Sequence, residues 1–168
     1  PKLSAPDART VADWAAKRTP LVLLDRIGNA HNLGAIARTA AFFGVEHIVI
    51  PAHPQAALPG EAAYRVSEGG LEQVTVWRTP DLAKLMRELA AAGYDVAGAA
   101  ARGGKPVALE GPAKPVALVL GNEEHGLAAD VERACTRLVT IPGSGRVESL
   151  NVSVAGAVLI YALLAGRR

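Results

Sequence analysis

Polar side chains interrupt three otherwise apolar stretches of the sequence, and the first contains Arg38. Arg38 is the only formal charge between Arg26 and Glu46. It either faces solvent or lies in a partly apolar cleft, where its planar guanidinium would grip a phosphate through two hydrogen bonds. The pattern leaves both alternatives open.

The second stretch, "ALVLG" at 117–121, is followed at once by carboxylates, including Glu123 and Glu124. Gly121 ends the apolar run, and glycine permits a positive φ or the close approach of another backbone. These residues form either a polar turn or a ligand site, because α/β proteins bind ligands beyond the carboxyl ends of parallel strands. The G-x-G-x-x-G spacing of dinucleotide-binding proteins is not present.

The third stretch is "IPGSGRVESLNVSVAGAVLIYALLAG" at 141–166. Ser149 and Asn151 stand where a long apolar helix is predicted to begin. Helix capping by Ser149 explains one polar residue. It does not explain Asn151 in the first turn, where an Asn side chain competes with the backbone for hydrogen bonds. Asn151 is therefore a candidate functional residue.

Other chemistry is not supported by the spacing of reactive residues. "GGKP" at 103–106 lacks the spacing of a phosphate-binding loop and the Ser or Thr after Lys. The four histidines do not follow a metal-ligand pattern, so we expect no metal. Cys135 is predicted within a helix, where it packs rather than reacts. No Ser/His/Asp arrangement is evident.

The elements that must position these residues alternate along the chain. Continuous Val/Leu/Ile runs predict strands that are covered on both faces, at 20–26, 47–50, 74–77, 94–100, 116–121 and 137–142. Helices are predicted at 5–18, at 33–43 with Asn32 as N-cap, and at 80–93, 127–135 and 150–165. This alternation predicts an α/β fold, a mostly parallel sheet with helices on both faces. Residues 101–115 form the one long loop expected.

The composition fits a single domain whose core needs no disulfides or metal ions to be stable. The chain has 168 residues, of which 50% are hydrophobic, and a net charge of +2 with a pI near 9.0. This mildly basic balance permits an anionic partner without requiring one. A single cysteine and no signal peptide favour the reducing cytoplasm. The chain begins with Pro1 rather than Met, so we expect a fragment of a longer protein. Residues 1–19 are then a helical arm or the remnant of an upstream domain.

The uncharged segment near the end is too short for a membrane anchor. Residues 149–166 carry no charge. A helix over 151–164 would be roughly 21 Å long at about 1.5 Å per residue, whereas a bilayer core is about 30 Å thick. No membrane partner is therefore expected, and the helix should be buried in a core or an interface.

Together the three stretches resemble the motifs of the SpoU (TrmH) family of SPOUT methyltransferases. "NLGAIARTAAFFG" is similar to motif one, "LVLGNEEHGL" to motif two and "IPGSGRVESLNVSVAGAVLIYAL" to motif three, in that order. The resemblance covers residues 20 to 166 and makes 20–168 the catalytic domain. It implies 2′-O-methylation of ribose in tRNA or rRNA with S-adenosylmethionine as cofactor.

The resemblance also implies a fold and a partner. The C-terminal segment would be threaded through a loop as a deep trefoil knot, although knots are very rare in proteins. The enzyme would be a homodimer with its active site at the interface, so the last helix would pack on the knot and on the partner.

Residue roles follow from the same resemblance. It implies a catalytic set of Asn32, Arg38, Glu123, Ser149 and Asn151. It implies cofactor contacts from Leu120, Gly121, Asn122, Ile141, Pro142 and Leu150. The general base stays open between Arg38, whose guanidinium hardly ever loses its proton, and a relay through the phosphate or Ser149.

One position departs from the family pattern. Many members carry Met after the "IP" of motif three, where this sequence has Gly143. The alternative function is therefore an RNA-binding module of the same fold with weak or no turnover. A nucleotide-binding enzyme of another α/β class rests only on the alternation of strands and helices.

Overall fold

A parallel sheet forms the centre of the molecule. The computed structural model describes residues 2–109, 111 and 113–165. Within them, seven strands are joined in the order β3-β2-β1-β6-β4-β7-β5, and every pairing is parallel. The strands are β1 (Leu21–Leu24), β2 (His47–Pro51), β3 (Thr75–Thr79), β4 (Asp95–Ala99), β5 (Lys105–Pro106), β6 (Val116–Leu120) and β7 (Arg137–Thr140).

The continuous apolar runs supply two cores at once. Successive side chains of a strand point to opposite faces. In β1, Val22 and Leu24 therefore join one core, whereas Leu21 and Leu23 join the other. The predicted α/β fold with helices on both faces is confirmed.

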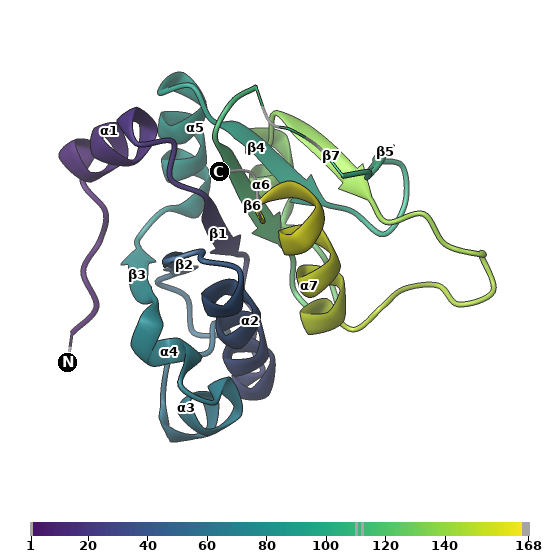
Figure 1. Cartoon of the computed structure of the whole chain (residues 1–168), viewed down its shortest axis with the longest axis horizontal. Helices are drawn as coiled ribbons and strands as arrows, with labels where there is room; N and C mark the ends of the chain where they lie inside the picture. Colours follow the sequence, from purple (N-terminus) through teal and green to yellow (C-terminus); the bar gives the residue numbers. More distant parts are fainter. Residues whose placement is uncertain (1, 110, 112, 166–168) are drawn as a thin grey trace.

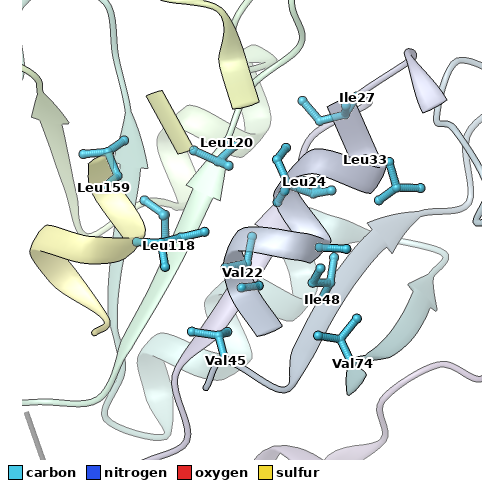
Figure 2. Close-up of a cluster of buried hydrophobic side chains, with 14 of the residues drawn as sticks. Val22, Leu24, Ile27, Leu33, Val45, Ile48, Val74, Leu118, Leu120 and Leu159 are labelled. Carbon is cyan, nitrogen blue, oxygen red and sulfur yellow. The ribbon is translucent and has the colours of Figure 1, made fainter. Parts of the chain in front are cut away.

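Helices cover each face of the sheet (Figure 1). One face carries α2 (Ala30–Phe42), α3 (Glu61–Ser67), α4 (Gly70–Gln73) and α7 (Val152–Leu163), and the other carries α1 (Ala8–Ala16), α5 (Leu82–Ala91) and α6 (Ala129–Ala134). Figure 2 shows part of the first core, where Leu33 of α2 and Leu159 of α7 pack with strand residues such as Leu24 and Leu118.

Helices α3 and α4 are not predicted by the sequence patterns, because each is short and Gly69 separates them with a φ of 88°. They pack very closely on α2. A Cβ atom on Gly34 of α2 would overlap the carbonyl oxygen of Ala63. A Cβ atom on Gly70 would lie 2.7 Å from the Cα of Arg38. Both glycines are therefore needed for this packing.

The two edges of the sheet differ. At the β3 edge the N-terminal segment lies alongside, and the amide of Arg78 donates to the carbonyl of Ser4 over 2.9 Å. The other edge, β5, is only two residues long. Helix α1 buries Val11 and Trp14 in the second core.

Some element boundaries differ from expectation. Residues 101–115 contain β5, and 52–60 and 141–151 are further long connections without regular structure. Cys135 directly follows α6 instead of lying inside it. No helix in the described part of the chain is long and apolar enough to cross a membrane.

Candidate active site

Asn29, and not Asn32 as predicted, caps the N-terminus of α2. Its side-chain oxygen accepts hydrogen bonds from the amides of His31 at 2.8 Å and Asn32 at 3.3 Å. The side chain of Asn32 is therefore not needed as the cap. Its Nδ2 instead donates to Oε2 of Glu123 over 3.3 Å. Two predicted site residues, 91 positions apart, are thus in contact.

The Glu123 carboxylate sits at the N-terminus of α2. Besides the amide of Asn32, it accepts the backbone N–H groups of Gly28 and Asn29, each at 3.0 Å. Partial burial would raise the pKa of Glu123, but hydrogen bonds from its own backbone, Gly28, Asn32 and Asn29 lower the pKa below its ordinary value. Glu123 is held as an anion where the helix dipole favours one.

A second set of bonds locks the same two turns together. Asn122 donates from Nδ2 to the carbonyl of Arg26 over 2.7 Å. The buried carboxylate of Asp25 accepts the amide of Ala128 at 2.7 Å and pairs with Arg26 at 3.0 Å. The turns after β1 and β6 are therefore joined to each other by hydrogen bonds from both sides.

Asp25 is missing from the predicted site. The sequence feature that could have identified it is the acidic residue at the end of the otherwise apolar run "LVLLD". A buried carboxylate requires hydrogen-bond partners, and Asp25 finds them in the turn that carries Glu123.

Of the two alternatives predicted for Gly121, the close approach of another backbone is the one observed. A Cβ atom there would lie 2.5 Å from the carbonyl carbon of Gly126 and 2.6 Å from the amide of Leu127. The carbonyl of Leu120 accepts the amide of Asp25 at 2.7 Å. Leu120, Gly121 and Asn122 thus serve the turn itself, whatever further contact they make with a cofactor.

The N-cap of α7 is Asn151, whose side-chain oxygen accepts the amide of Ser153 at 2.9 Å and its hydroxyl at 2.6 Å. The prediction that capping would not explain Asn151 is therefore wrong, and so is the assignment of the cap to Ser149. Ser149 is exposed and has no hydrogen bond within the described ranges.

Helix α7 brings its N-terminus to the same edge of the sheet as α2. A Cβ atom on Gly156 would lie 3.0 Å from Leu120 and 3.7 Å from Ile36. Further along both helices, the rings of Phe43 and Tyr161 are 5.6 Å apart. The two helices therefore run in the same general direction. Since α2 begins at the carboxyl edge of the sheet, the cap of α7 also lies on that side.

Arg38 lies six residues beyond Asn32 on α2, with its side chain exposed. Among the residues that the structure describes, it has neither a hydrogen bond nor an ion pair. Its backbone is supported by Gly70 of α4. Within this chain Arg38 therefore faces solvent, which leaves its guanidinium available to an external anion.

In the part of the chain that the structure describes, the connection 141–151 leaves two backbone donors unused. The backbone N–H groups of Ile141 and Leu150 find no acceptor in the described residues, and the side chains of Pro142 and Leu150 are exposed. A Cβ atom on Gly143 would meet nothing within 4 Å, so packing does not require glycine there. In the described ranges, no group of three or more His, Cys, Asp or Glu side chains could hold a metal ion.

Known sequences share this arrangement of segments. A sequence model described as the SpoU rRNA Methylase family matches residues 19–161. The chain belongs to the SpoU family. The expected relationship is thereby confirmed over nearly the whole sequence.

Individual relatives agree with this placement. The chain is 37% identical over 148 residues to an uncharacterized tRNA/rRNA methyltransferase of Mycolicibacterium vanbaalenii, covering 88% of the chain and 47% of the relative. It is 36% identical over 141 residues to the 23S rRNA (guanosine-2'-O-)-methyltransferase RlmB of Nitrosomonas europaea, covering 84% and 54%. The chain thus spans about half the length of these SpoU relatives.

A solved structure confirms the fold. The AdoMet-bound rRNA methyltransferase of Sinorhizobium meliloti matches with a TM-score of 0.79 at 28% identity, over 96% of this chain and 60% of that one. The sheet and helices described above are therefore shared with that rRNA methyltransferase.

Proposed function

We propose that the chain is the catalytic domain of an S-adenosylmethionine-dependent enzyme that methylates the ribose 2′-OH of tRNA or rRNA. The contact between Asn32 and Glu123 carries the proposal, because it joins the segments that resemble motifs one and two at the carboxyl edge of the sheet. The activity of the Nitrosomonas relative and the AdoMet bound by the Sinorhizobium one support it.

The cofactor would be held mainly by the connection that follows β7. Backbone groups of Ile141 and Leu150 would bind its adenosine part beside Pro142. Leu120, Gly121 and Asn122 would form the turn next to it. S-adenosylmethionine supplies an electrophilic methyl group, so the enzyme must orient the ribose hydroxyl and remove its proton.

The chain's own residues divide these tasks. Glu123 fixes the amide of Asn32, which orients the ribose. Arg38 binds the phosphate of the target nucleotide through its free guanidinium. Ser149 is free to pass on the proton from the 2′-OH. Asn151 fixes the start of α7 beside it.

A homodimer completes the proposed enzyme. Val154, Val158 and Tyr161 are spaced along one side of α7 and are exposed, and Phe42 of α2 is 82% exposed. Exposed apolar surface of this kind is typical of protein interfaces. The Phe43 ring connects the two helices, since it lies 5.0 Å from Phe42 and 5.6 Å from Tyr161.

We also propose the trefoil knot. It is supported by the return of α7 from β7 to pack against α2 and Leu120 in the middle of the sheet. Single-molecule stretching tests it. A knotted chain should stop short of the roughly 3.6 Å per residue of a fully extended chain, whereas an unknotted chain reaches that length.

The cytoplasm remains the proposed compartment. Cys135 is the only cysteine, and burial, with smaller contributions from Glu132 and Asp25, raises the pKa of its thiol to about 11. An unreactive lone thiol accords with a reducing environment.

Transfer of radiolabelled methyl groups to unmodified tRNA and rRNA tests the proposed activity. Asn32→Ala and Arg38→Ala should each lower the rate at least about 100-fold, the usual size of positioning and acid–base effects. Arg87→Ala on α5, at the opposite face, is the matched control and should keep full activity. Wild-type protein that binds RNA but transfers no methyl group would favour the non-catalytic RNA-binding module instead.

A further inference from the structure

Two loops at the β5 edge of the sheet carry a group of cations. Arg102 lies just before β5, Lys105 is the first residue of β5, and Arg146 belongs to the connection after β7. All three residues are exposed. Glu148 is the only acidic residue in segments 102–105 and 144–148. We call these two segments the basic loop pair.

The first segment of the basic loop pair is fixed to β7. The hydroxyl of Thr140 accepts the amide of Gly104 at 2.9 Å and donates to the carbonyl of Ala100 at 2.9 Å. Lys105 pairs with Val139 in the sheet. A side chain on Gly104 would come within 2.6 Å of the Thr140 hydroxyl. The backbone on either side of Arg102, and Lys105 itself, are therefore held by β7, the strand that precedes the connection carrying Arg146.

One contact joins the two segments. Nη2 of Arg102 lies 3.2 Å from Oε1 of Glu148, and the two side chains are 78% and 79% exposed. Such an exposed ion pair adds little stability and is screened by salt. A phosphate group can replace the carboxylate, because guanidinium binds both anions through the same two-pronged geometry.

We infer that the basic loop pair binds the sugar-phosphate backbone of the substrate RNA, and that Glu148 is a counterion which the RNA displaces from Arg102. The inference rests on the proposed function and extends it. The basic loop pair carries three cations and one carboxylate, a balance that suits a polyanion. Glu148 directly precedes Ser149 and Leu150, so its release would couple RNA binding to the segment proposed to hold cofactor and substrate.

RNA affinity at several salt concentrations tests this inference. Arg102→Ala, Lys105→Ala and Arg146→Ala should each weaken the binding of an unmodified tRNA transcript several-fold at low salt. Each should also reduce the slope of log affinity against log salt by about 0.7 to 0.9 per lost phosphate contact. Glu148→Gln should have the opposite effect and strengthen RNA binding, because RNA then has no Arg102–Glu148 ion pair to break. Lys84→Ala on α5 is the control and should change neither quantity.

The two proposals fail in distinguishable ways. One outcome is that the wild type binds RNA while the alanine variants of Arg102, Lys105 and Arg146 show the same affinity and the same salt dependence. In that case the basic loop pair is not the RNA contact surface. Weaker binding after Glu148→Gln would also overturn the inference. If the variants change sedimentation and leave RNA affinity intact, the surface joins copies of the protein instead. If the wild type neither binds RNA nor transfers methyl groups, the proposed function itself fails, which calorimetry with S-adenosylmethionine would show independently.

Discussion

Glu123 acts on the site through hydrogen bonds that it accepts. Its two oxygens accept hydrogen bonds from the backbone N–H groups of Gly28 and Asn29 and from the side-chain amide of Asn32. A carboxylate engaged in this way is a poor proton acceptor, because protonation would sacrifice those bonds. Its contribution to the proposed reaction is therefore the orientation of Asn32.

Replacing Glu123 with Gln should show the strength of these hydrogen bonds as a change in stability. The amide keeps one acceptor and loses the charge, so we expect a stability loss of about 1 kcal/mol at neutral pH, small because the group remains open to solvent. The pKa of Glu123 is lowered in the folded protein, so its contribution is present above the unfolded value near 4.5 and is lost as pH falls through the folded pKa. Urea unfolding of wild type and variant should converge at low pH.

Glu124→Gln is the matched control for this experiment. Glu124 is exposed, and among the described residues its carboxylate pairs only with the exposed His125, at 3.6 Å. It should unfold like the wild type at every pH. Equal effects of the two substitutions would contradict the role assigned to Glu123.

His47 provides a second pH-dependent contact, on the far side of the sheet from α2. Its Nδ1 accepts the indole N–H of Trp77 at 3.1 Å, and the Trp14 ring lies 5.3 Å away. Partial burial lowers the pKa of His47, and nearby Glu46 opposes this only in part. Since the folded pKa is below the unfolded value of 6.5, protonation favours unfolding.

Stability should therefore fall as pH decreases from 6.5 through the folded pKa of His47. The free energy of unfolding should therefore differ less between pH 7.5 and pH 5 in His47→Asn than in the wild type. We expect the reduction to be up to about 1 kcal/mol, the size of one hydrogen bond. Urea unfolding followed by tryptophan fluorescence at pH 7.5 and 5 measures it. His125→Asn, at an exposed position, should leave the pH dependence intact. An unaltered profile for His47→Asn would refute the argument.

At the scale of elements, α2 is held by backbone contact with α3 and α4. Gly34 meets the carbonyl of Ala63, and Gly70 meets the backbone of Arg38. The buried hydroxyl of Ser67 links α3 to α4, because it donates to the carbonyl of Tyr64 and accepts the amide of Leu71. The position of Arg38 thus depends on two short helices that make no other contribution to the proposed site.

Gly70→Ala should disturb Arg38 and destabilise the fold. Overpacking typically lowers the free energy of unfolding by about 1–3 kcal/mol. For a chain of this size, each kcal/mol lowers the melting temperature by roughly 2–4 °C. Calorimetric melting and methyl transfer measure the two effects. Gly60→Ala is the control, since the nearest atom to its Cβ would be 4.0 Å away. A fully active and equally stable Gly70→Ala protein would contradict this packing argument.

Asn151 and Ser149 should separate structural from chemical roles at the start of α7. Asn151→Ala removes the N-cap and should cost about 1 kcal/mol of stability. Ser149→Ala removes an exposed hydroxyl and should leave the melting temperature unchanged while lowering methyl transfer. Calorimetry and the transfer assay together test the pair. A destabilised Ser149→Ala, or an equally stable Asn151→Ala, would reverse these assignments.

The same elements show what the sequence could predict. The six longer strands were predictable because each contains a short run of apolar residues, which in β1 and β6 is buried on both faces. Helices α3 and α4 were not, because each is too short for helical periodicity and their packing depends on glycines. The predicted helix caps were wrong by a few residues: Asn32 was predicted where Asn29 is the cap, and Ser149 where Asn151 is the cap. The resemblance named Asn32 and Glu123, but only the fold shows that they touch.

At the scale of the whole molecule, the exposed side of α7 should control assembly. Val158→Asp places a charge among Val154, Tyr161 and Phe42, where an apolar partner surface is proposed. Burying an unpaired charge is costly, so we expect monomers in sedimentation velocity and little methyl transfer. Lys84→Glu on α5 serves as control and should remain dimeric. A Val158→Asp protein that sediments as a dimer would exclude this surface.

The two ends of the sheet have a consequence for solubility. Exposed edge strands can recruit strands from other molecules and start aggregation. At one end β5 offers only two residues, and Pro106 has no N–H group to donate. At the other, the longer β3 already gives the N–H of Arg78 to Ser4. The residues before α1 therefore cover part of the β3 edge and oppose self-association. Removing them would expose this longer edge strand to pairing with strands of other molecules.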